Sequence, residues 1–310
     1  MLVAGGYNNS KYLQSVEIYD PSTASWTIAN SMAYIRAHHT ASVLANGQVF
    51  VTGGYTGGKS LNSTELFDPS TGVWTLAANM SYARRYHTGT TLIDGNILVA
   101  GGHDGSVYLS AAEIYDPSTG TWAITGSMNT ARRKHTDSLL ANGKVLITGG
   151  EDGSSSSLSS AELYDPSTRM WTVTTNMFAT RTEHTATVLA NGTVLVAGGS
   201  KGGFLRSTEL YDPSTELWTL TGNMTRTRES YTATLLSNGK VLVVAGKISS
   251  GYTNSTEIYD PTTGIWSVAQ SIHTGRYAHT ASLLNNGQVL ITGGYNPDIG
   301  YLNSTELYQP

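Results

Sequence analysis

The sequence has no cysteine, little charge and no long apolar run. Without cysteine the chain has no disulfide, no thiolate ligand for a metal and no thiol nucleophile. Charged residues make up 13% of the 310 residues, about half the share that soluble proteins typically carry. The net charge of −4 argues against nucleic-acid binding. No apolar run approaches the roughly 18 residues of a membrane-spanning helix, so we expect no membrane insertion.

Glycine is abundant instead, and it recurs in pairs at a fixed spacing. Successive Gly-Gly pairs lie 47 to 49 residues apart, with an Ala-Gly pair in one position. These pairs begin at Gly5, Gly53, Gly101, Gly149, Gly198, Ala245 and Gly293. All six tryptophans follow the same spacing, and so does a Tyr-Asp-Pro segment that reads Phe-Asp-Pro once and Tyr-Gln-Pro at the end. A period near 50 residues indicates one structural unit repeated along the chain.

Each period contains four short runs rich in β-branched and aromatic residues, which predict strands. In one period these runs cover 184–189, 193–199, 208–212 and 217–221, and we label them a, b, c and d. Ala-Asn-Gly links a to b, and Asp-Pro-Ser-Thr links c to d, and both are turn sequences. No segment shows a sustained helical period. Four strands per repeated unit are typical of a β-propeller blade.

The repeat resembles the kelch motif. A double glycine closes one strand, Glu-x-Tyr-Asp-Pro follows in the next, and tryptophan, arginine and His-Thr come before the next apolar run. The resemblance covers the whole chain and implies an all-β, kelch-type β-propeller of four-stranded antiparallel blades. It says little about function, because many unrelated activities occur on this fold.

The number of blades follows from the number of runs. We count seven b, seven c, six d and six a runs, or 26 strands, whereas six blades need 24 and seven need 28. Six blades would leave the apolar strands of 288–310 over, at a cost in exposed apolar surface. We therefore favour seven incomplete blades over six. We expect one domain over 1–310, with about 48 residues per repeat and an array cut at one end or both.

Antiparallel connections alternate between the two ends of a sheet, so the b–c and d–a loops share one face. An arginine occurs in every d–a loop, and a glutamate precedes every Tyr-Asp-Pro by two residues. We expect these arginines to be structural, each paired with a glutamate, because a buried charge needs a partner. The arginines are Arg36, Arg84, Arg132, Arg181, Arg228 and Arg276.

Other positions on this face change from blade to blade, and they are our candidates for ligand binding. They follow the fixed arginine or the double glycine, and they include a basic arc, an acidic arc and several tyrosines. The candidates are Arg85, Tyr86, Arg133, Lys134, Tyr7, Tyr55, His103, Glu151, Lys247, Tyr277, Tyr295, His38, Glu183 and Glu229. Together they are expected to surround the mouth of the propeller channel.

The favoured function is a non-enzymatic binding module, with Arg85, Arg133 and Lys134 holding an acidic protein or peptide beside tyrosine rings. The resemblance supports this, because kelch adaptors of ubiquitin ligases hold acidic peptides through arginines of comparable loops. One alternative is an extracellular carbohydrate-binding propeller. Another is an enzyme of the sugar-mutarotase type, with Glu183 or Glu229 as acid or base. A purely structural repeat is the third.

Metal and cofactor chemistry has little support in the sequence. The periodic histidines His39, His87, His135, His184 and His279 have no Asp or Cys at ligand spacing, so we interpret them as structural. Galactose oxidase also carries kelch-like repeats, but its copper-radical site needs a tyrosine crosslinked to cysteine. We therefore expect no metal, no cofactor and no enzymatic activity of that kind.

The sequence contains seven Asn-x-Ser/Thr sequons, which could be glycosylated only if the chain enters a secretory pathway. Their acceptors are Asn8, Asn62, Asn79, Asn191, Asn223, Asn254 and Asn303. The low charge and the hydroxyl-rich composition favour an extracellular over a cytoplasmic location, and a glycan as a second ligand class. We expect a monomer.

Overall fold

The computed structural model describes all 310 residues, and its secondary structure consists of strands without helices. It therefore contains no helix of the length and apolarity that a membrane span requires. The chain is a β-propeller of seven antiparallel blades, as the repeat predicted. Two compact units make it up. The first comprises residues 1–145, 152–154 and 162–172, and the second comprises 146–151, 155–161 and 173–310.

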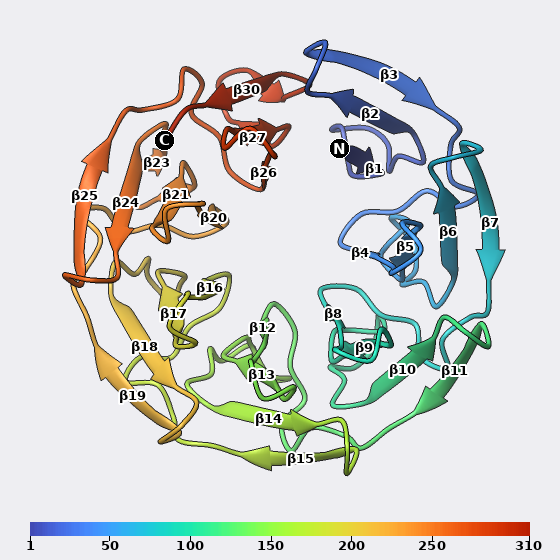
Figure 1. Ribbon diagram of the computed structural model, residues 1–310, viewed down its shortest axis with the longest axis horizontal. Coiled ribbons are helices and arrows are strands. Elements are labelled where there is room, and N and C mark those ends of the chain that lie inside the picture. The colour runs from blue at the N-terminus through green and yellow to red at the C-terminus, as the bar shows by residue number, and fades with distance from the viewer. The chain divides into compact units, whose positions relative to one another are not determined.

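The first unit contains blades 1 to 3, and Figure 1 labels their strands. Blade 1 consists of β1 (Leu2–Ala4), β2 (Val16–Asp20) and β3 (Ser25–Ala29). Blade 2 consists of β4 (Thr40–Val43), β5 (Val49–Thr52), β6 (Thr64–Asp68) and β7 (Val73–Ala77). Blade 3 consists of β8 (Thr88–Thr91), β9 (Ile97–Ala100), β10 (Ala112–Asp116) and β11 (Thr121–Ile124). The division between the units runs through blade 4, which consists of β12 (Thr136–Leu139), β13 (Val145–Thr148), β14 (Ala161–Asp165) and β15 (Met170–Val173).

The second unit contains blades 5 to 7. Blade 5 consists of β16 (Thr185–Val188), β17 (Val194–Ala197), β18 (Thr208–Asp212) and β19 (Leu217–Leu220). Blade 6 consists of β20 (Thr232–Leu235), β21 (Val241–Val244), β24 (Thr256–Asp260) and β25 (Ile265–Ala269). Blade 7 consists of β26 (Thr280–Leu283), β27 (Val289–Thr292) and β30 (Thr305–Tyr308). Two small hairpins extend the b–c loops of blades 6 and 7: β22 (Lys247–Ile248) with β23 (Gly251–Tyr252), and β28 (Tyr295–Asn296) with β29 (Gly300–Tyr301).

The strands match the four predicted runs of each repeat. In blade 5 the order β16-β17-β18-β19 is antiparallel throughout, and Glu209 of β18 lies opposite Val196 on one side and Leu220 on the other. The first blade lacks an a strand and the last lacks a d strand. The prediction of seven incomplete blades is therefore confirmed.

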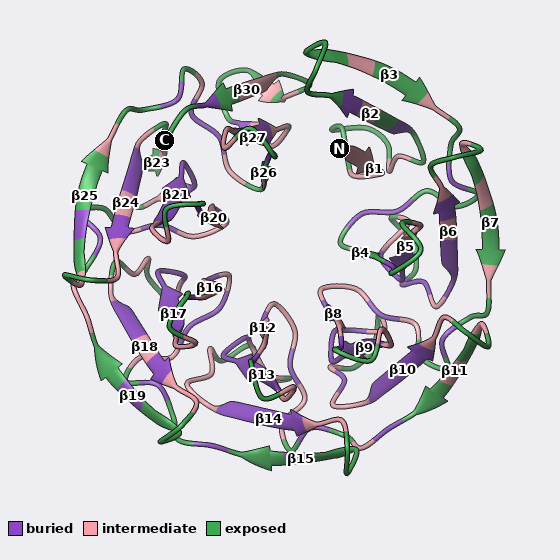
Figure 2. Ribbon diagram, in the orientation of Figure 1, coloured by how far each residue is buried: buried purple, intermediate pink, exposed green.

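The apolar core lies between neighbouring blades. The b strands β9, β13, β17 and β21 are buried at every residue, because each has a sheet neighbour on both sides and another blade against its faces. One core cluster joins blades 2 and 3 through Phe50, Val99 and Tyr115, and the rings of Phe50 and Tyr115 stack at 4.2 Å. The d strands, by contrast, are largely exposed, as the green outer strands of Figure 2 show.

Candidate functional site

The invariant arginine of each d–a loop is buried and paired with the periodic glutamate, as predicted. Arg84 is 0% exposed, and its Nη2 lies 2.7 Å from Oε1 of Glu113 in the next blade. Its Nη1 donates to the carbonyl oxygens of Gly101 and Ala111 at 2.8 and 3.0 Å. The same ion pair occurs at Arg36–Glu65, Arg132–Glu162, Arg181–Glu209, Arg228–Glu257 and Arg276–Glu306. These arginines join adjacent blades and are not available to a ligand.

The paired glutamate also fixes the course of the d–a loop. Glu113 accepts hydrogen bonds from the backbone N–H groups of Ser81 and Tyr82, at 2.6 and 3.2 Å. The double glycine anchors the other end of this segment, because the N–H of Gly54 donates to the carbonyl of Arg84 at 2.8 Å. A Cβ on Gly53, whose φ is 62°, would lie 2.5 Å from that carbonyl oxygen. Glycine is therefore needed at this close approach.

Directly after the anchored arginine, the variable positions form a short ladder with the b–c loop of the next blade. Arg85 makes a β-bridge with His103, and His103 makes a second bridge with Tyr108. In the next-to-last blade the same three positions are Glu229, Lys247 and Tyr252. The backbone therefore presents three adjacent variable residues per blade on the face of the b–c and d–a loops, which we call the loop face.

The residue after this bridge has a left-handed backbone in every copy, with φ between 51° and 57°. Backbone hydrogen bonds link these residues from blade to blade. In the first unit Tyr86 N–H donates to the carbonyl of His38, and Lys134 N–H donates to that of Tyr86, at 3.2 and 3.0 Å. In the second unit Ala278 N–H donates to the carbonyl of Ser230 at 2.8 Å. A non-glycine residue at positive φ is strained, and the surrounding structure must hold it there.

Tyrosine rings and an arginine meet at the start of the loop face in the first unit. The guanidinium carbon of Arg85 lies 4.1 Å from the ring centroid of Tyr55. Tyr55 is in edge contact with Tyr12 at 5.4 Å, and Tyr12 contacts Tyr7 at 4.8 Å. Burial, followed by the charges of Tyr55 and Tyr7, raises the pKa of Tyr12. We call Tyr7, Tyr12, Tyr55 and Arg85 the Arg85 cluster.

The remaining basic candidates lie in a second cluster of the same unit. The guanidinium of Arg133 lies 4.7 Å from the ring centroid of Tyr108 and 5.6 Å from that of Tyr86. Lys134 Nζ is also 5.6 Å from the Tyr86 ring, which packs against His38 at 4.2 Å. His103 contacts Tyr108 edge-on at 5.1 Å. The structure thus places the predicted basic residues of the first unit against tyrosine rings, in two clusters.

The second unit presents a different set of side chains at the equivalent positions. Lys247 Nζ lies 3.3 Å from Glu229 Oε1. Burial, and then the charge of Glu183, raises the pKa of Glu229, while Lys247 opposes the shift. Glu183 accepts a hydrogen bond from the hydroxyl of Ser230. Two of the three predicted acidic residues, Glu183 and Glu229, are therefore neighbours.

Three tyrosines of the last blade are also in contact in the second unit. Tyr277 and Tyr295 meet at 5.5 Å, and Tyr295 contacts Tyr301 at 4.7 Å. Glu151 makes a bridge with Ser157.

Four tyrosines and one phenylalanine of the loop face were not among the predicted candidates. They occupy the b–c loop position that bridges the residue after the double glycine, a position held by serine in blades 2 and 4 and by an aromatic residue in the others. The aromatic members are Tyr12, Tyr108, Phe204, Tyr252 and Tyr301. These residues lie four to six positions after the residue that follows the double glycine. An alignment of the repeats on the double glycine that allowed for this variable spacing would have found them.

The periodic histidines form hydrogen bonds within the wall of inner strands. His87 Nε2 lies 3.1 Å from Thr40 Oγ1 and 3.2 Å from Thr52 Oγ1, and His135 Nε2 lies 3.0 Å from Thr88 Oγ1. Burial, with help from Arg132, lowers the pKa of His135 to about 3. No three His, Asp or Glu side chains converge as a metal site would require. The interpretation of these histidines as structural agrees with these contacts.

The repeated sheets, the buried Arg–Glu pairs and the variable loop face define a kelch β-propeller. The sequence matches the family model described as the KLHDC2/KLHL20/DRC7 Kelch-repeats domain over residues 1–177 and 123–294, and the chain belongs to this family. A search of curated proteins gave no match.

One solved structure with the same fold is "Novel fungal alcohol oxidase with catalytic diversity among the AA5 family, in complex with copper". It aligns with a TM-score of 0.83 over 100% of this chain and 71% of its own, at 20% sequence identity. At that identity the likeness shows the fold alone. The residues present here do not fit a copper centre of that kind, because no cysteine is present and no metal-ligating side chains converge.

Proposed function

We propose that this chain is a non-enzymatic binding module that holds an acidic segment of a protein or peptide on the loop face of its first unit. The observation that carries the proposal is the environment of Arg85. Arg84 is committed to Glu113, whereas the guanidinium of Arg85 lies over the Tyr55 ring and its buried Nε has no hydrogen-bond partner within the protein. Kelch propellers usually bind proteins, which agrees with this use of the face.

An arginine held over an aromatic ring suits the recognition of a carboxylate. The ring fixes the guanidinium plane, so less side-chain entropy is lost when the edge of that plane binds a ligand. The donors of a guanidinium match the two oxygens of a carboxylate, and such charge-assisted pairs are stronger than neutral hydrogen bonds. Tyr7, Tyr12 and Tyr55 supply the rigid aromatic area that is enriched at binding hot spots.

Arg133 and Lys134 extend the same surface with further positive charge. Each is held against tyrosine rings of neighbouring blades. Clustered cations increase the rate of encounter with an acidic partner, and salt screens this effect. We therefore expect association to slow as the ionic strength rises.

The experiment is titration of the chain with fluorescent peptides that carry two to four Asp or Glu residues, beside neutral peptides of the same length. The test variant is Arg85→Glu. The matched control is Arg169→Glu, because Arg169 lies in a c–d turn and its counterpart in the next blade is Glu216, with nearly the same φ. We expect acidic peptides to bind wild type and Arg169→Glu, and to bind Arg85→Glu at least about ten times more weakly. Equal binding to both variants would overturn the assignment of this site.

An enzyme of the sugar-mutarotase type is the second candidate, and the pair Glu183–Glu229 favours it. A partly buried carboxyl with a raised pKa beside another carboxylate is suited to proton transfer. Turnover of a reducing sugar that disappears in Glu229→Gln would support this candidate over the binding module. Mutarotation at the uncatalysed rate with wild type would reject it.

A further inference from the structure

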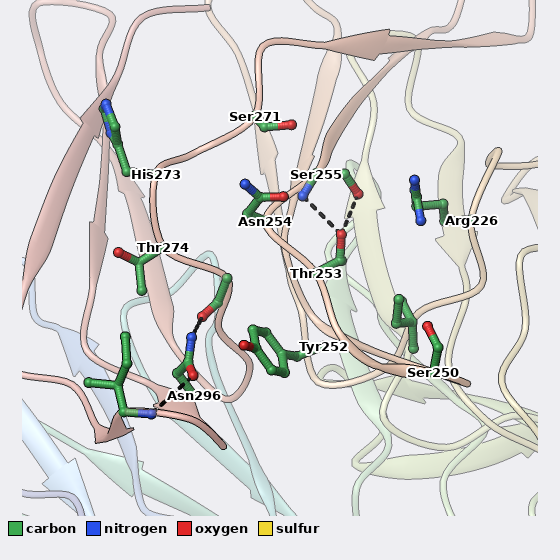
Figure 3. Close-up of a pocket in the computed structure, with 13 residues that line it drawn as sticks. Arg226, Ser250, Tyr252, Thr253, Asn254, Ser255, Ser271, His273, Thr274 and Asn296 are labelled. Carbon is green, nitrogen blue, oxygen red and sulfur yellow. Dashed lines mark hydrogen bonds between the residues drawn. The ribbon is translucent and has the colours of Figure 1, made fainter.

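The second unit contains a polar cavity whose lining includes neither the Arg85 cluster nor Arg133 and Lys134. It has a volume of about 660 Å³ and lies among the b–c hairpins of blades 6 and 7 and the d–a loop between them. Figure 3 shows hydroxyl and amide side chains around it, with Arg226 on one side and His273 on the other. A smaller cavity of about 360 Å³ continues past Arg226 to Arg206. We call the two cavities together the Arg226 groove.

The groove depends on one tyrosine and on residues that fit around it. Tyr252 of β23 donates its hydroxyl proton to Asp298, in the turn between β28 and β29. A Cβ on Gly275 would lie 2.7 Å from the Tyr252 ring, and this is the copy of the d–a loop in which glycine precedes the fixed arginine. The absence of a side chain at residue 275 therefore lets the ring pack there.

A buried amide also bonds to the backbone of Gly275. Asn296 is 4% exposed and donates from Nδ2 to the carbonyl of Gly275 at 2.7 Å. Its Oδ1 accepts the backbone N–H of Asp298 at 2.9 Å. Both hairpins and the intervening loop are thus held in a fixed relation, and the groove between them is preformed.

The groove offers hydrogen-bonding groups that the protein itself does not use. The hydroxyls of Ser250, Ser271 and Thr274 make no side-chain hydrogen bond, although Thr274 uses its backbone N–H to bind Glu306. The guanidinium groups of Arg206 and Arg226 have no acidic partner in the described structure. Small-molecule pockets are usually lined by apolar groups with a few polar ones. A groove with the opposite balance is suited to a ligand that is itself covered with hydroxyls.

We propose that the Arg226 groove binds an anionic oligosaccharide. Ser250, Ser271 and Thr274 would bond sugar hydroxyls, and Arg226 and Arg206 would bind carboxylate or sulfate groups, with which guanidinium forms bidentate pairs. Two arginines without acidic partners favour an anionic over a neutral sugar. The proposal is independent of the acidic-peptide site, because it rests on residues of the second unit only.

The test is calorimetric titration of the full chain with three saccharide probes of matched length: trigalacturonate, a sulfated heparin trisaccharide and uncharged maltotriose. Inorganic sulfate alone is a fourth arm. We expect at least one anionic saccharide to bind and maltotriose to bind at least about ten times more weakly. Binding of sulfate as tight as that of the sulfated saccharide would reduce the groove to a simple anion site and overturn the proposal, as would the absence of binding by every saccharide.

Variants assign the binding to the groove. The double variant Arg206→Ala, Arg226→Ala should bind the anionic saccharide at least about ten times more weakly than wild type. Ser271 lies at an exposed position of the rim, so Ser271→Trp should weaken binding of the anionic saccharide by filling the cavity. Arg169→Glu removes a cation from a c–d turn of the first unit and should leave binding of the anionic saccharide unchanged. Binding that survives both groove variants, or that is lost only in Arg85→Glu, would contradict the assignment.

Discussion

Arg84 and Arg85 are adjacent in one loop and have opposite surroundings. Arg84 is completely buried, donates to two carbonyl groups and pairs with Glu113 of the next blade. Arg85 lies over the ring of Tyr55 on the loop face and pairs with no carboxylate. The blades repeat the first environment, so every copy has arginine there. The second environment varies, so the copies differ.

The comparison also shows that the fixed residue supports the variable one. Glu113 forms the ion pair with Arg84 and also accepts hydrogen bonds from the backbone N–H groups of Ser81 and Tyr82. The carbonyl of Arg84 in turn accepts a hydrogen bond from the N–H of Gly54. The loop is therefore rigid up to residue 84, and Arg85 projects from a fixed backbone. Sites built on rigid elements position their side chains more closely than flexible loops do. Blade packing and ligand recognition are consequently separate roles that share one segment.

The largest expected effect comes from breaking the buried pair. Arg84→Met leaves Glu113 as a buried carboxylate without its guanidinium partner. Removing one member of a buried ion pair typically costs about 3–5 kcal/mol, so we expect the free energy of unfolding to fall by about that amount. Urea denaturation followed by tryptophan fluorescence measures it. A loss below about 1 kcal/mol would contradict a structural role for the fixed arginine.

The second prediction concerns the inner histidines and pH. Burial lowers the pKa of folded His135 to about 3, whereas the unfolded value is about 6.5. Between these values the unfolded chain binds a proton that the folded chain excludes. Stability is therefore fully present above about pH 6.5 and falls as the pH drops towards 3, by up to about 1.4 kcal/mol per pH unit for this group.

His135→Tyr should remove this dependence without removing the hydrogen bonds. Tyr231 occupies the same position in a later blade, where its hydroxyl donates to Ala197 O at 2.5 Å and accepts a hydrogen bond from Thr185 Oγ1 at 3.0 Å. Gly101 leaves room for the larger ring beside residue 135, as Gly198 does beside Tyr231. Urea denaturation at pH 7, 6, 5 and 4.5 gives the free energy of unfolding at each pH. We expect this free energy to fall less steeply with decreasing pH in His135→Tyr than in wild type. Identical slopes would show that His135 does not titrate differently in the two states.

The third prediction concerns the geometry of recognition at Arg85. Arg85→Lys keeps the charge but loses the planar fork and its stacking on Tyr55. We expect acidic peptides to bind this variant more weakly than wild type and more tightly than Arg85→Glu. Titration of all three proteins at low and high salt separates charge from geometry. Full affinity in Arg85→Lys would mean that charge alone attracts the ligand.

The repeat allowed the fold and the Arg–Glu pairs between blades to be predicted, because a residue present in every copy is explained by the packing that every blade shares. The strand order, the seven blades and the Arg84–Glu113 contact followed from this periodicity. The variable positions could be located by the same comparison of copies. Their contacts could not, since the approach of Arg85 to Tyr55 depends on how two loops from different blades meet.

Features that occur once were not accessible from the pattern. The Arg226 groove depends on the fit of Tyr252 against Gly275 and on the buried amide of Asn296. In the sequence Gly275 is one more glycine among 34. Only the spatial arrangement shows that its missing side chain leaves space for a ring from another loop.

The most direct test of the account is a paired measurement on Arg85→Ala. Urea denaturation gives its stability, and titration with an acidic peptide gives its affinity. We expect the free energy of unfolding to change by no more than about 2 kcal/mol, the worth of a partly desolvated cation–π contact, together with a loss of affinity of at least about ten-fold. A loss of several kcal/mol in stability with unchanged affinity would contradict it, since Arg85 would then be a packing residue like Arg84.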